Sequence, residues 1–178
     1  TLGIAHGLDE DALSKQSHEI ELANRSSSCR ILQGIEVDIL SDGTLGLPSR
    51  ALGDLEIVIA SVHSGVSQER DIMTRRILSA LDNEHVDIIG HPTGRIIGRR
   101  HPYAVDMDRV IDRARDTSTA LECNASPYRL DLDDIHIRQA IEHGVRIAIG
   151  SDAHDASEFG HIQYGVTTCR RGWAEDPD

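Results

Sequence analysis

Side chains able to bind a metal ion follow one short apolar segment of the sequence. Residues 145–149 are mostly β-branched and apolar, which predicts a buried strand, and Asp152 and His154 come directly after it. Side chains two positions apart on an extended chain point to the same side. This carboxylate and imidazole can therefore form half of a metal site. The alternative is an aspartate that caps the next helix beside a solvated histidine.

Four further segments, also predicted as strands, carry polar side chains of the same kind near their ends. In α/β folds, reactive groups gather where the carboxyl ends of parallel strands meet, so these side chains are expected at one mouth. The segments are 31–39, 55–62, 86–89 and 119–125, and with them come Glu36, His63, His91, and Glu122 with Asn124.

Segments with helical features separate these predicted strands. A buried strand followed by a helix, repeated along the chain, indicates an α/β fold with mainly parallel pairing. Asp131 is expected to cap one of the helices. Residues 158–178, with Phe159, Tyr164 and Trp173, are interpreted as a packing tail. The predicted helices cover about 9–24, 67–81, 106–116 and 131–143.

The mixture of carboxylates and imidazoles, without thiolates, suits Zn, Mn or Fe rather than a structural zinc cage. So many ligands favour two or more ions, and Glu36 is the candidate to bridge them with its two oxygens. Such sites polarise phosphoryl groups and generate hydroxide at neutral pH. The alternative for Glu36 is an ion pair with an arginine.

A glycine-rich basic loop follows His91. Arg95 and Arg99 in this loop are candidates to bind a substrate phosphate bidentately, or they are ordinary surface arginines. His6 lies in an early glycine-containing loop and belongs either with the substrate-binding residues or with the surface histidines.

Composition limits the classes of protein that fit. The chain has 178 residues, 39% of them hydrophobic, which predicts one domain over 1–178. Thirty acidic and eighteen basic residues give a net charge of −12, which argues against broad adhesion to nucleic acids or membranes. Three scattered cysteines predict no disulfide framework, and no apolar run suggests a membrane span or signal peptide. We expect a cytoplasmic protein.

Five motifs in this order resemble the polymerase and histidinol phosphatase (PHP) family, and most closely the PHP domain at the C-terminus of family X DNA polymerases. The resemblance extends over essentially the whole chain. The motifs are GIEVD (34–38), ASVHS (60–64), GHPTGR (90–95), LECNASPYRL (121–130) and SDAH (151–154).

The resemblance implies a distorted (β/α)7 TIM-like barrel with up to three metal ions. It implies that Glu36 is the bridging carboxylate and that His63, His91, Asp152 and His154 are metal ligands. Glu36 and Asp152 are then the catalytic carboxylates. The implied activity is phosphoester hydrolysis, and in polymerase-linked members a manganese-dependent 3′-5′ exonuclease with a role in DNA repair, acting on DNA 3′ ends.

The chain departs from the family pattern at its start. The first two family motifs, a His-x-His pair and an Asp-His pair, are expected before residue 1, and His6 matches neither. We therefore expect a barrel that lacks its first two strands and exposes two sheet edges, which invites dimerisation. A histidinol-phosphate-type phosphatase and a non-catalytic metal-binding remnant are the alternative functions.

Overall fold

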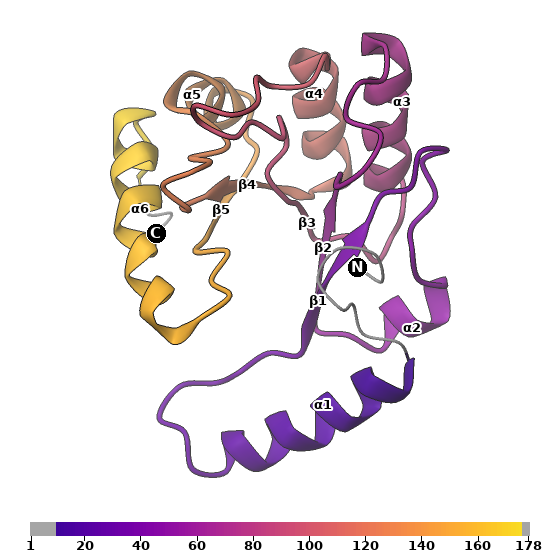
Figure 1. Ribbon diagram of the computed structural model, residues 1–178, viewed down its shortest axis with the longest axis vertical. Coiled ribbons are helices and arrows are strands. Elements are labelled where there is room, and N and C mark those ends of the chain that lie inside the picture. The colour runs from indigo at the N-terminus through magenta and orange to yellow at the C-terminus, as the bar shows by residue number, and fades with distance from the viewer. Residues whose placement is uncertain (1–9, 176–178) are drawn as a thin grey trace.

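The computed structural model describes residues 10–175, and in them five strands form a single sheet (Figure 1). The strand order is β1-β2-β3-β4-β5, and every neighbouring pair is parallel. The predicted α/β class with parallel strands is confirmed, although each strand is shorter than expected. The strands are β1 (Gly34–Asp38), β2 (Ile57–Ser61), β3 (Ile88–Ile89), β4 (Ala120–Asn124) and β5 (Ile147–Gly150).

Helices alternate with the strands, and α3 to α6 lie along the outer side of the curved sheet (Figure 1). The four predicted helices correspond to α1, α3, α4 and α5, whereas α2, η1 and α6 were not predicted. No helix in this part of the chain is long and apolar enough to span a membrane. The helices are α1 (Glu10–Asn24), α2 (Ser49–Gly53), α3 (Arg70–Leu81), α4 (Met107–Thr117), α5 (Asp134–Glu142), the 3-10 helix η1 (Ala156–His161) and α6 (Ile162–Arg171).

The core lies between the outer side of the sheet and the helices that cover it. Met73 and Ile77 of α3 and Val110 and Ile111 of α4 are fully buried, as their helical spacing predicts. Burying one such side chain is worth about 1.5–3 kcal/mol relative to leaving it in water. This packing fixes the strands, and with them the residues at the strand ends.

The sheet is open in residues 10–175. Strand β1 pairs only with β2, and β5 pairs only with β4. The sheet is curved, and its two edge strands lie on either side of the concave face (Figure 1). Closure into a seven-stranded barrel is not seen among these strands and stays a prediction.

Helix α5 begins later than predicted, because a different aspartate caps it. The Asp133 carboxylate accepts a hydrogen bond from the backbone N–H of His136 at 3.0 Å. Asp131, the expected cap, is instead fully buried and accepts a hydrogen bond from the Thr93 hydroxyl at 2.8 Å. Long-range hydrogen bonding therefore overrides the local capping signal at Asp131.

The C-terminal region is helical, and its aromatic side chains do not pack as predicted. Phe159, Tyr164 and Trp173 are 66%, 44% and 70% exposed, so the predicted tail packs, but not through these aromatic side chains. Helix α6 instead approaches the sheet through small residues. A Cβ at Gly165 would lie only 2.5 Å from the Ile149 side chain of β5, so this close approach requires glycine.

Candidate metal centre

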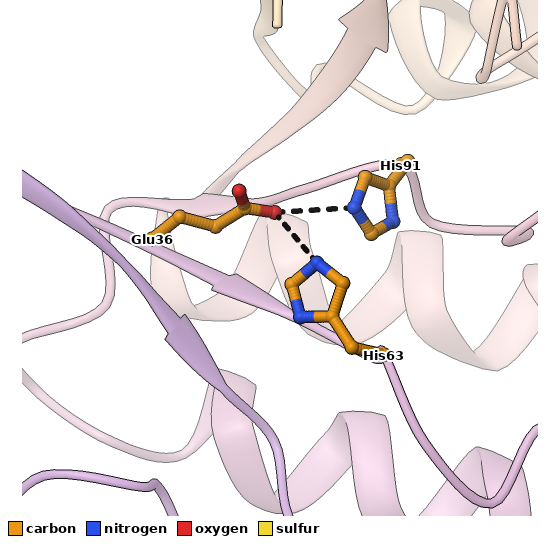
Figure 2. Close-up of side chains that lie close together, drawn as sticks. All are labelled: Glu36, His63 and His91. Carbon is orange, nitrogen blue, oxygen red and sulfur yellow. Dashed lines mark ion pairs between the residues drawn. The ribbon is translucent and has the colours of Figure 1, made fainter. Parts of the chain in front are cut away.

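Three side chains from adjacent strands converge at one point (Figure 2). The Nε2 atom of His63 lies 3.2 Å from Oε1 of Glu36, and Nε2 of His91 lies 3.1 Å from the same oxygen. One potential ligand atom from each residue lies within 4.8 Å of the others. Glu36, His63 and His91 therefore form a cluster that could bind a metal ion, as the sequence suggested.

The strand register explains why these residues meet. Glu36 on β1 is level with Ile59 on β2, and Ile59 is level with Ile88 on β3. The two histidines lie four and three residues beyond these partners, just past the carboxyl ends of β2 and β3. Parallel strands thus bring side chains far apart in sequence to one end of the sheet.

His91 is held rigidly by its backbone. Its side chain is 2% exposed, and its φ of 28° is unusual for a residue other than glycine. The backbone N–H of His91 donates a 2.6 Å hydrogen bond to Oε2 of Glu122, which is itself buried on β4. Nδ1 of the imidazole is buried without a hydrogen-bond partner, while Nε2 points at Glu36.

A second carboxylate orients His63. Oδ1 of Asp38 lies 2.6 Å from Nδ1 of the imidazole, which turns Nε2 towards Glu36. Buried Arg76 of α3 reinforces this end of the sheet, since its guanidinium donates hydrogen bonds to the backbone carbonyls of Ile39 and Ser64. Carboxylates that fix a histidine in this way are a common outer layer of metal sites.

Attraction between Glu36 and His63 shifts the pKa values of these two residues in opposite directions. Burial alone would raise the pKa of Glu36, but hydrogen bonds from His63 and His91 outweigh it and lower that pKa well below its usual range. Burial alone would lower the pKa of His63, but Glu36 and Asp38 raise it instead. The cluster thus favours a negative carboxylate beside a positive partner, and a divalent cation can replace the proton as that partner.

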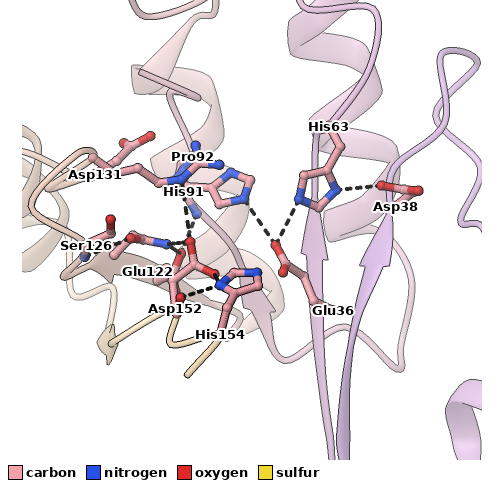
Figure 3. A network of polar contacts seen from close by, with 12 residues as sticks. Glu36, Asp38, His63, His91, Pro92, Glu122, Ser126, Asp131, Asp152 and His154 are labelled. Atoms are coloured by element: carbon pink, nitrogen blue, oxygen red, sulfur yellow. Dashed lines mark hydrogen bonds and ion pairs between the residues drawn. The ribbon is translucent and has the colours of Figure 1, made fainter. Parts of the chain in front are cut away.

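A second polar cluster lies beside the first, nearer β5 (Figure 3). The Asn124 amide donates to Oδ2 of Asp152 at 3.1 Å and to Oε2 of Glu122 at 3.3 Å. Burial raises the pKa of Glu122 to about 8, and the nearby charges of Asp152 and Glu36 add to the effect. The space for Glu122 depends on glycine, because a Cβ at Gly150 would lie 2.4 Å from its Oε1.

Asp152 and His154 lie close to each other and beside Glu122 (Figure 3), and neither belongs to the group of Glu36, His63 and His91. Asp152 has a positive φ of 52°, and its Oδ2 lies 3.5 Å from Nε of Arg129. The His154 side chain is 71% exposed, with Nδ1 3.9 Å from Oδ1 of Asp152. The two residues are neighbours, although β5 ends at Gly150 and Asp152 is not in the extended conformation that the sequence argument assumed, and their role as a metal half-site stays a prediction.

The three predicted substrate-binding residues have different surroundings. Arg95 donates hydrogen bonds to the carbonyls of Arg129 and Leu130 and lies 3.4 Å from Asp133, so its guanidinium ties two loops together. Arg99 is exposed on the loop after β3. His6 lies outside the described residues.

Sequence reasoning missed the residues that support the ligands. Asp38 shares the polar side of β1 with Glu36, and this alternation was the signal available for its role. Arg76 gave no signal, because its position in a helix looks like that of any surface arginine. Arg129 was noted only as part of a motif, although its Nη1 is buried without a partner and its Nε faces Asp152.

A cavity of about 490 Å³ lies elsewhere, near the start of β1 and beside α2. Its lining includes Leu13, Gln33 and Leu55. Gln33 directly precedes β1, so the cavity lies at the amino end of that strand. Glu36 and Asp38 lie towards the carboxyl end of β1. Cavity volume alone therefore does not locate the metal cluster.

Comparison with known proteins identifies homologues over nearly the whole chain. The chain is 47% identical over 175 residues to the DNA polymerase/3′-5′ exonuclease PolX of Bacillus subtilis, a match that covers 98% of this chain. It is 34% identical over 146 residues to a probable phosphatase of Caldanaerobacter subterraneus. A probable phosphatase of a Thermoanaerobacter species is 33% identical over 166 residues.

The chain is a homologue of PolX and of PHP-type phosphatases. The resemblance drawn from the five motifs is thereby confirmed. The matches to the two probable phosphatases cover 76% and 87% of this chain. The chain itself spans 31% of the length of the PolX relative, and 55% and 65% of the lengths of the two probable phosphatases. No protein-family model matches the chain.

Proposed function

We propose that this chain is a metal-dependent phosphoesterase domain. The observation that carries the proposal is the cluster of Glu36, His63 and His91, with one carboxylate oxygen shared between two imidazole nitrogens at 3.1 and 3.2 Å. A carboxylate and two histidines are a donor set that suits Mn, Zn or Fe. The relatives support the same chemistry, since one is named an exonuclease and others probable phosphatases.

The residues present fit a metal ion at this position. Glu36, His63 and His91 would hold it, while Asp152 and His154 would contribute to a second position on the β5 side of the same face. A bound ion would supply Lewis-acid polarisation of the phosphoryl group and lower the pKa of a water. The chain's own contribution is to orient His63 through Asp38 and to hold His91 through Glu122.

Within this class, we favour a manganese-dependent 3′-5′ exonuclease acting on DNA ends in the cytoplasm. Its support is the PolX relative, which is named a DNA polymerase/3′-5′ exonuclease and whose match covers 98% of this chain. A small-molecule phosphatase of the histidinol-phosphate type is the second candidate, supported by the probable phosphatases.

The open, curved sheet supports a proposal about the domain as well. Residues 1–178 would belong to a single PHP domain, and two further strands pairing with β1 and β5 would close its sheet into a barrel. The sequential order of parallel strands and the helices on the outer side suit such a barrel.

The function is tested by assaying two substrates side by side. Labelled single-stranded DNA and histidinol phosphate would each be incubated with the chain and Mn²⁺, with His63→Ala, Asp152→Ala and the remote His143→Ala as variants. We expect loss of DNA 3′-end hydrolysis in the first two variants and full activity in the third. Hydrolysis of histidinol phosphate alone would favour the second candidate, and metal binding without activity on either substrate would indicate a non-catalytic remnant.

A further inference from the structure

Two loops meet at the rim of the concave face, one following β3 and the other following β4. The backbone N–H of Ile97 donates a 2.7 Å hydrogen bond to the carbonyl of Tyr128. Arg95 of the first loop donates to the carbonyl of Arg129 in the second at 2.7 Å. Residues 96 and 100 form an antiparallel bridge, so the tip of the first loop is a tight hairpin held against the second loop.

The joined loops present an apolar and aromatic pair to solvent. Tyr128 is 64% exposed and Ile97 is 49% exposed, and the hydrogen bond between their backbones makes them neighbours. Exposed apolar side chains that adjoin one another mark binding surfaces more often than scattered ones do. An exposed tyrosine on a backbone fixed by hydrogen bonds offers a π face at little cost in conformational entropy.

The same loop is basic in an otherwise acidic chain. Between Asp87 and Asp106 the sequence has three arginines and no acidic residue, whereas the whole chain has a net charge of −12. The Arg99 side chain is exposed and makes no hydrogen bond or ion pair to the described residues. Arg99 belongs to the same hairpin as Ile97, whose backbone contacts Tyr128. A cation without a partner, on a loop that contacts an exposed aromatic residue, is complementary to a phosphate next to a base.

The surface formed by Ile97, Arg99 and Tyr128, here called the rim surface, is joined through the residues around Tyr128 to the second polar cluster, that of Asn124 and Asp152. Arg129, the residue after Tyr128, extends its Nε to 3.5 Å from Oδ2 of Asp152. Ser126, two residues before Tyr128, donates its backbone N–H to the side chain of Asn124 at 3.1 Å. Tyr128 thus stands on a segment anchored on both sides to the polar face.

We propose that the rim surface binds single-stranded DNA near its 3′ end, with a base stacked on Tyr128 and Ile97 and an adjacent phosphate bound by Arg99. This inference rests on the proposed function, because it assigns a nucleic-acid substrate to the same mouth. Stacking on an aromatic ring tolerates any base, which suits an enzyme that removes nucleotides without regard to sequence.

Binding is measured by the fluorescence anisotropy of a labelled oligo-dT in the presence of a chelator, so that no hydrolysis occurs. We expect Tyr128→Ala to weaken binding at least about fivefold, the low end of what one lost base–aromatic stack costs. Tyr128→Phe should retain the affinity of the parent chain. Arg99→Ala should weaken binding and reduce its dependence on salt by about one phosphate contact.

The matched controls are Tyr164→Ala on α6 and Arg75→Ala on α3, which replace exposed residues of the same types on outer helices. The affinity of each control for oligo-dT should lie within twofold of that of the parent. A 2-aminopurine at the 3′ end of the oligonucleotide adds a stacking readout, because its fluorescence should be quenched by the parent and by Tyr128→Phe and not by Tyr128→Ala. The proposal is overturned if the parent chain does not bind, or if Tyr128→Ala and Arg99→Ala bind as the parent does.

A small substrate separates this inference from the proposed function. Hydrolysis of bis(p-nitrophenyl) phosphate by the parent chain with Mn²⁺ tests the phosphoesterase assignment separately, because that assay involves no DNA. If the parent does not hydrolyse this small substrate while oligo-dT binding still depends on Tyr128, the phosphoesterase assignment fails and the rim surface stands. Hydrolysis by the parent together with unchanged DNA binding in Tyr128→Ala overturns the rim surface alone.

Discussion

Glu122 connects the two polar clusters although it lies outside the group of three candidate ligands. Its carboxylate accepts the backbone N–H of His91 and the amide of Asn124, and Asn124 in turn reaches Asp152. A change at Glu122 is therefore transmitted to residues on both sides of the concave face. Outer groups of this kind commonly set metal affinity through the ligands that they position.

Gly150 provides a direct test of this connection. In Gly150→Ala the new Cβ would lie 2.4 Å from Oε1 of Glu122, so the carboxylate must move. We expect a loss of about 1–3 kcal/mol in the free energy of unfolding, as for other overpacked sites. Manganese affinity should fall as well. Urea denaturation and a metal titration measure the two effects.

The control for this substitution is Gly160→Ala, where a Cβ meets nothing within 4 Å. Its stability should stay within about 0.5 kcal/mol of the parent, as for other surface changes. Equal effects from the two substitutions would contradict the special role of Gly150.

Arg76 is a second residue whose role follows from burial. Its side chain is 2% exposed, and it bonds the carbonyl of Ile39 after β1 and that of Ser64 after β2. Arg76→Ala should lower the free energy of unfolding by about 2–4 kcal/mol, since the carbonyls of buried Ile39 and of Ser64 lose their charged donor and packing is lost. Exposed Arg75→Ala, on the same helix, should change it by less than about 0.5 kcal/mol. Thermal and urea unfolding of both variants distinguish the two roles.

The candidate ligands could be predicted from the sequence, whereas their supports could not. Glu36, His63 and His91 follow a simple pattern, a polar side chain at the end of an apolar run. The contact of Asp38 with His63, or of Glu122 with the His91 backbone, depends on packing between strands that are far apart in sequence. No local pattern indicates which of several carboxylates reaches which partner.

Secondary-structure elements were predictable where one buried face makes apolar residues recur at a regular spacing, and less predictable elsewhere. The β-branched runs and the four-residue spacing of α3 are strong signals because one face of each element packs in the core. Helix α2 has only five residues, too few to show a period. Helix α6 packs through Gly165 and Cys169 rather than large apolar side chains, which hides its inner face from a pattern search.

The start of α5 offers a pH-dependent test. The hydrogen bond that the His136 imidazole donates to the Asp133 carboxylate raises the pKa of His136. That histidine therefore stabilises the fold fully below its ordinary value of 6.5 and less as pH rises through the raised value. The same bond lowers the pKa of Asp133 to about 2, so its contribution is present above 3.8 and lost as pH falls further. The interaction therefore contributes most between these ordinary values.

His136→Ala should accordingly cost about 1 kcal/mol of unfolding free energy near pH 5.5 and clearly less near pH 8.5. Urea denaturation at both pH values measures the difference. Exposed His143→Ala, at the other end of α5, is the control and should show a smaller change with pH. A cost for His136→Ala that is the same at both pH values would contradict the pairing.

At the scale of the whole molecule, the two sheet edges are the main open feature of residues 10–175. Unpaired parallel strands offer backbone hydrogen bonds to another chain. Ile149 of edge strand β5 is 37% exposed, which adds an apolar contact. The predicted dimerisation through these edges is a consequence that can be measured.

Light scattering over a range of concentrations should show association of the parent chain. Ile149→Lys should weaken it at least about tenfold, because edge lysines oppose strand pairing. Ile135→Lys, on the solvent face of α5 where the side chain is 73% exposed, is the matched control and should associate as the parent does. A chain that stays monomeric at the highest concentration would rule out edge pairing.

The most direct test of the central claim is a calorimetric titration of the metal-free chain with Mn²⁺, beside Glu36→Gln. This substitution keeps the shape of the side chain and removes the charge that His63 and His91 share. We expect binding in the parent that weakens by at least about 10- to 100-fold in the variant, the range that even outer-layer substitutions cost. Exposed Glu142→Gln should bind as the parent does. Unchanged affinity in Glu36→Gln, or no binding by the parent, would contradict a metal centre built on Glu36, His63 and His91.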